Sequence, residues 1–150
     1  MQLKILIAII LVVSISSCKK NTRKITTSIA ETEEISLLDT LTLKLDNGKK
    51  WIVNIETQIG INKMDSIIMA FNKGDEKDYS YLGKDLSIHT SHIIRSCNMK
   101  GEAHDQLHVV LVPMINEISV LKEYNNKQEC RRALRNLEEL IDDYFKHFHL

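Results

Sequence analysis

The chain has 150 residues, of which 43% are hydrophobic and 27% are charged, with 20 basic side chains against 20 acidic ones. This is the length and composition of one small globular domain, and it excludes a disordered or fibrous protein. The even charge balance also excludes the basic surface that a nucleic-acid-binding protein needs.

Residues 1–17 have the features of a cleaved signal peptide. Lys4 supplies a positive charge, and an unbroken apolar run follows from Ile5 to Val13. Nine apolar residues are too few to span a bilayer, which takes about 20. The run therefore predicts a signal peptide rather than a transmembrane helix.

The end of this leader, Ile15-Ser16-Ser17-Cys18, resembles the lipobox of bacterial lipoproteins. The resemblance implies that Cys18 is acylated, with palmitate among its acyl groups, and becomes the N-terminus of a membrane-anchored protein. An aspartate after the cysteine retains such lipoproteins in the inner membrane, and Lys19 does not match it. We therefore expect the periplasmic face of the outer membrane.

An arm is predicted between the anchor and the folded body. Residues 18–38 are rich in Thr, Ser, Glu and Lys without a helical or strand period, which is typical of a flexible tether. Residues 39–55 alternate apolar and polar side chains on both sides of Asn47-Gly48, a pair that tolerates positive φ and favours a tight turn. We expect a short β-hairpin or extended arm, with Trp51 packed on the helices.

Residues 56–150 predict an all-α fold, an antiparallel up-down-up-down four-helix bundle. Apolar stripes of helical period indicate helices over about 56–72, 78–98, 102–124 and 130–148. The third stripe continues in phase across Pro113, so we expect one kinked helix there. Similar lengths and short loops favour antiparallel neighbours.

This topology predicts two unpaired cysteines. Cys97 ends the second helix and Cys130 begins the fourth, so the third helix, about 30 Å long, separates them. A disulfide needs Cα atoms within about 7 Å. The chain also has no Gly-rich phosphate loop and no nucleophile elbow, and we expect no enzymatic activity.

Soft metal donors gather at one predicted end of the bundle. Cys97 and Met99 lie at the corner between the second and third helices, and His104 and His108 are one turn apart at the start of the third. Imidazoles at i and i+4 share a helix face, and together with sulfur donors they suit copper or zinc better than magnesium or calcium. The pattern predicts a copper or zinc site, as in a metal buffer or transport accessory.

A second interpretation is a structural or protein-interaction bundle without a cofactor. In that case Met99 fills the corner of the core, and the two histidines lie on the flank of the bundle.

Under the metal interpretation, Glu102 and Asp105 are expected to hold the outer ring nitrogens of the histidines.

From Met99 to its end, the chain resembles the soluble periplasmic b-type cytochromes with a four-helix bundle. The shared features are a helix with an early histidine, a short loop, and a final helix that ends in aromatic residues, including Tyr144. The segment from Cys97 to His108 is also similar to that of small uncharacterised periplasmic four-helix-bundle lipoproteins, a resemblance that implies a family and no activity.

The cytochrome resemblance implies a third interpretation, noncovalent haem between a methionine and a histidine. Met64 stands for the methionine on the first helix. Phe145 occupies the position of the family's histidine, and the nearest candidates are His147 and His149. No Cys-x-x-Cys-His is present for covalent attachment of haem.

Overall fold

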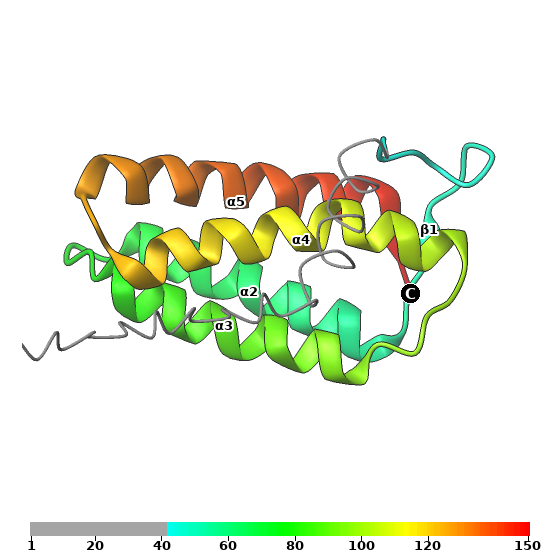
Figure 1. Ribbon diagram of the computed structural model, residues 1–150, viewed down its shortest axis with the longest axis horizontal. Coiled ribbons are helices and arrows are strands. Elements are labelled where there is room, and N and C mark those ends of the chain that lie inside the picture. Colours follow the sequence, from blue (N-terminus) through cyan, green and yellow to red (C-terminus); the bar gives the residue numbers. More distant parts are fainter. Residues whose placement is uncertain (1–41) are drawn as a thin grey trace, which may run out of the picture.

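The computed structural model describes residues 42–150, so the predicted signal peptide, Cys18 and the tether lie outside the described residues. Within these residues, four helices form a bundle, and two two-residue strands, one before the first helix and one after the last in the chain, lie together at one end of it (Figure 1). In chain order the elements are β1 (Trp51–Ile52), α2 (Ile55–Lys73), α3 (Tyr79–Ser96), α4 (Glu102–Glu123), α5 (Lys127–His147) and β2 (Phe148–His149).

The helices form the predicted antiparallel up-down-up-down bundle. Each helix packs on the next along the chain, and α5 returns to contact α2 (Figure 1). Polar caps start two of them: the Asp78 carboxylate accepts from the amide of Tyr81 at 2.9 Å, and the Asn126 side chain accepts from the amide of Glu129 at 2.8 Å. Such caps satisfy amides that have no partner inside the helix.

The four stripes read from the sequence form one core. Its members include Met64, Leu86, Met114 and Leu137, each with no exposed surface.

Helix α4 continues through Pro113 as a single helix, as predicted. Cys130 is buried and Cys97 half-buried, and both are free thiols, which confirms the prediction drawn from the topology. Within residues 42–150, no helix is long and apolar enough to cross a membrane.

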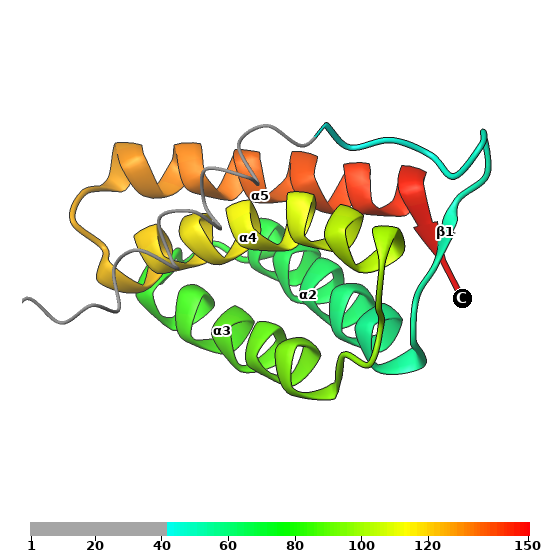
Figure 2. The same cartoon turned by 45° about the vertical axis from the view of Figure 1, so that its right-hand side comes forward.

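The arm contains the predicted tight turn, closed by a single antiparallel bridge. Asn47 and Gly48 have φ of 48° and 83°, and Asp46 and Lys49 exchange two backbone hydrogen bonds of 2.8 Å. Beyond the turn, β1 pairs in parallel with β2 at the far end of the chain, and the two strands lie side by side at one end of the bundle (Figure 2). The expected hairpin is therefore limited to the antiparallel bridge between Asp46 and Lys49, and the rest of the arm is extended.

The antiparallel pairing ends at this bridge because side chains bind the backbone groups of the arm. The amide of Lys44 donates to the Gln106 side chain on α4 at 2.7 Å, and the carbonyl of Lys44 accepts from the indole of Trp51 at 2.7 Å. The first bond holds the segment before the turn against α4. Because both backbone groups of Lys44 are bonded to side chains, they are not used in a backbone ladder with β1.

Candidate metal site

The backbone between α3 and α4 brings the predicted donors together. The amide of Cys97 closes α3 by donating to the carbonyl of Ile93 at 2.9 Å. Gly101 has φ of 65° and ψ of −154°, a conformation open essentially only to glycine. Its carbonyl accepts from the amides of His104 and Asp105 and starts α4. The short loop thus sets the end of α3 against the first turn of α4.

The thiol and an imidazole meet at this corner. The Sγ of Cys97 lies 3.6 Å from the Nδ1 of His104. The rings of His104 and His108 are in contact, with centroids 4.3 Å apart. All three side chains are half-buried, as is Met99 in the loop between them, which packs against the core.

The distance between the thiol and the imidazole fits two ligands of one metal ion. Zinc–sulfur and zinc–nitrogen bonds are about 2.3 and 2.1 Å long, so two such ligands on a tetrahedral ion lie about 3.6 Å apart. The Cys97–His104 distance has this value. The same spacing fits a thiol–imidazole hydrogen bond, in which the thiol proton occupies the place of the metal.

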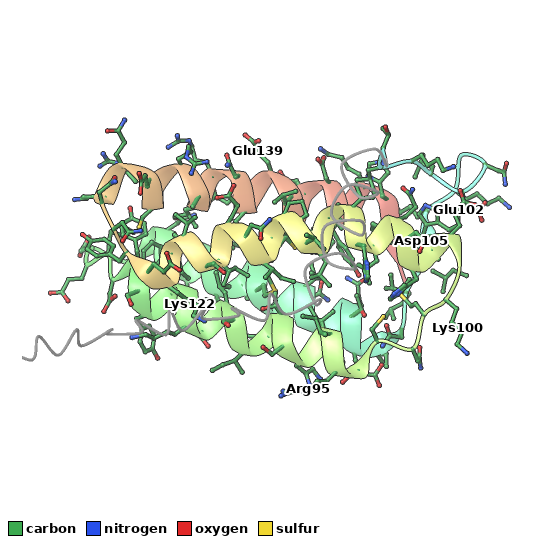
Figure 3. All side chains as sticks on the ribbon, in the orientation of Figure 1. Arg95, Lys100, Glu102, Asp105, Lys122 and Glu139 are labelled. Atoms are coloured by element: carbon green, nitrogen blue, oxygen red, sulfur yellow. The ribbon has the colours of Figure 1, made fainter. Side chains whose placement is uncertain are left out.

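The rest of the predicted ligand set is not preformed. Among residues 42–150, no three His, Cys, Asp or Glu side chains form a group that could hold a metal ion. Glu102, expected to support an imidazole, instead pairs with Lys44 of the arm at 2.6 Å. Asp105 is exposed at the same end of the bundle (Figure 3). A complete site therefore needs Met99 or a movement of His108.

The residues of the haem interpretation do not lie together. Met64 is fully buried and is the tenth residue of α2, about 14 Å along the helix from its start. The Nδ1 of His147 lies 2.8 Å from the carbonyl of Asp143 on the preceding turn, and His149 is exposed in β2. Both histidines are thus at the end of the bundle, whereas Met64 is part of the core.

Sequence reasoning missed two polar residues that organise this end of the bundle. Gln106 is 1% exposed and binds the arm through both amide atoms, accepting from the amide of Lys44 and donating to the carbonyl of Thr42. It lies three residues after Ala103 and four before Val110, so its position on the apolar stripe was the available signal.

The second is Asn54, the residue before α2. Its side chain donates to the carbonyl of Ser96 at 3.1 Å and accepts from the hydroxyl of Thr57 at 2.6 Å, so it ties the start of α2 to the end of α3 beside Cys97. It also donates to Glu56, and hydrogen bonds from the backbone and then from Asn54 lower the pKa of that carboxyl.

No protein-family model, curated protein or solved structure matches this chain.

Proposed function

We propose that the chain is a non-enzymatic lipoprotein, anchored to the periplasmic face of the outer membrane through Cys18, whose helical bundle binds copper or zinc. The observation that carries the metal proposal is the 3.6 Å separation of the Cys97 Sγ and the His104 Nδ1. A thiolate and an imidazole at this spacing form half of a tetrahedral site.

Two further donors lie within the same corner. His108 touches the ring of His104 from the next turn of α4, so its imidazole is a candidate for the third ligand. Met99 offers a thioether from the loop, a ligand that selects Cu(I) over Zn(II). The identity of the remaining ligands thus determines which of the two metals is held.

The test is a metal titration of the full-length protein, kept reduced, with Zn(II) and with Cu(I) against a chromophoric chelator. We expect one equivalent to bind, and we expect Cys97→Ser or His104→Ala to weaken its affinity by at least about tenfold. Cobalt(II) should give a thiolate-to-metal absorption band that Cys97→Ser removes.

The matched control is His92→Ala, which removes an exposed histidine near the end of α3 and should leave the affinity unchanged. Met99→Leu and His108→Ala then identify the remaining ligands. Metal affinity equal in the wild type and in Cys97→Ser would contradict the proposed site. The absence of metal binding by the wild type would also contradict it and would favour a structural or interaction module without a cofactor.

A further inference from the structure

The face of α5 that points away from the core is entirely polar, and its charges follow a regular order. Figure 3 shows Glu139 on this outer side of the bundle. Outward positions recur at alternating steps of four and three residues, the spacing of a helix–helix seam. They are Gln128, Arg132, Arg135, Glu139, Asp142 and Lys146, flanked by Arg131 and Asp143.

The two halves of this face have opposite charge. Of these positions, three arginines, Arg131, Arg132 and Arg135, precede Leu137. Three carboxylates, Glu139, Asp142 and Asp143, follow it, and Lys146 stands after them. Within each half, like charges stand at i and i+4, between the first and third of each group, and these pairs disfavour the isolated helix. Opposite charges stand at i and i+4 between Arg135 and Glu139 and between Asp142 and Lys146, and these pairs favour it.

Little within the described residues neutralises these charges. Arg132 lies 3.9 Å from Glu117 of α4, and Asp143 pairs with Lys146 at 2.8 Å. The other four, Arg131, Arg135, Glu139 and Asp142, make no ion pair or hydrogen bond within residues 42–150. The hydrogen bond and the charge of Asp143 raise the pKa of Lys146, and the charges of Asp142 and Glu139 add to this effect. Most of the charge on this face therefore points into solvent.

The charges are placed symmetrically about the middle of the helix. Arg135 and Glu139 are each two residues from Leu137, Arg132 and Asp142 are each five, and Arg131 and Asp143 are each six. A second α5 can be placed antiparallel to the first, with its Leu137 at the same level along the helix axis. Every one of the three arginines would then face a carboxylate of the other helix.

We propose that the chain forms a two-fold dimer through the outer face of α5. The two helices are antiparallel, and the two-fold axis passes at the level of Leu137. A two-fold interface uses the same surface on both copies, so the three arginine–carboxylate pairs form twice. The symmetric order favours a second copy over a polyanionic or polycationic partner, which would need one sign of charge along the face. This inference does not depend on the proposed metal site.

The contact is solvated and electrostatic, so it should be weak and sensitive to salt. Exposed ion pairs contribute little singly, and the screening length falls from about 10 Å at 0.1 M salt to about 3 Å at 1 M. We expect the association constant of the dimer to fall by about tenfold or more over this range of salt.

The experiment measures the sedimentation of the full-length protein at low and high salt, for the wild type and for two triple variants. One variant makes the face acidic, with the substitutions Arg131→Glu, Arg132→Glu and Arg135→Glu. The other makes it basic, with the substitutions Glu139→Arg, Asp142→Arg and Asp143→Arg. Any anchor or leader is common to all samples, and circular dichroism checks that each variant is folded.

We expect a salt-sensitive dimer for the wild type and a monomer for each triple variant alone. An equimolar mixture of the two variants should form a heterodimer, because every facing pair is then opposite in charge again. A chain carrying all six reversals should dimerise like the wild type. The proposal is overturned if the triple variants associate as strongly as the wild type, or if the wild type stays monomeric in low salt at millimolar concentration.

Discussion

Tyr144 is a buried phenol whose protonation is linked to the stability of the fold. Its ring stacks on Phe148 with centroids 5.0 Å apart, and its hydroxyl donates to the Gln58 side chain at 3.1 Å. Burial raises the pKa of this hydroxyl. The folded protein therefore keeps the proton at a pH where the unfolded chain has begun to lose it.

This difference predicts a loss of stability at high pH. Because the folded pKa lies above the unfolded value of about 10, the stabilisation is complete below pH 10 and is lost as the pH rises further. Tyr144→Phe should cost about 1 kcal/mol near pH 7, through the hydrogen bond to Gln58. Its deficit relative to the wild type should shrink above pH 10.

Urea unfolding of both proteins from pH 7 to 11 measures this difference. The subtraction removes the titration of the other tyrosines and lysines, which both proteins share. A constant gap between the two stability profiles across this range would contradict the prediction.

At the level of elements, α3 and α4 approach each other closely at Gly83 of α3. A Cβ atom placed there would lie 2.5 Å from the backbone nitrogen of Lys122 and 2.9 Å from the carbonyl carbon of Leu121 on α4. The backbone cannot move aside as a flexible side chain can. Glycine is thus required for α3 and α4 to pack at this distance.

Gly83→Ala should therefore destabilise the protein although alanine is the better helix former. The propensity gain is about 1 kcal/mol, whereas forcing the two helices apart costs more, and we expect a net loss of about 2 kcal/mol in the free energy of unfolding. The control is Lys84→Ala at the next, exposed position of α3, which should change stability by less than about 0.5 kcal/mol. Equal melting temperatures for the two variants would show that α4 yields at this contact.

The sequence predicted the helices well because each one buries a single apolar stripe. Asp78 and the end of the second stripe located α3 to within about two residues, and the bundle topology then placed Cys97 beside His104. These predictions depend on period and connectivity, which are local properties of the chain.

The strands could not be predicted in the same way. The pairing of β1 with β2 joins Trp51 to Phe148 across nearly the whole described chain, and each strand has only two residues. No local pattern specifies so distant a partner. The pairing arises because the bundle brings the end of α5 next to the start of α2. Both backbones there have amide and carbonyl groups that are not bonded within a helix.

At the scale of the whole molecule, the arm joins the candidate metal site to both ends of the described chain. It lies on the first turns of α4 through Gln106 and the Lys44–Glu102 ion pair, and it leads directly into β1, which binds β2. Trp51 is the only tryptophan of the chain, is 9% exposed, and donates its indole proton to the carbonyl of Lys44. Its fluorescence therefore reports on whether the arm is bound.

Gln106→Ala should release the arm from α4 while the bundle stays folded. The substitution removes both hydrogen bonds to the arm and should cost about 1–3 kcal/mol. The emission of Trp51 should shift to longer wavelength and become more accessible to acrylamide, with the helical circular dichroism unchanged. Asp105→Ala, at the exposed neighbouring position, should leave emission and quenching as in the wild type. An unshifted spectrum in Gln106→Ala would mean that β1 and the packing of Leu43 hold the arm without the buried amide.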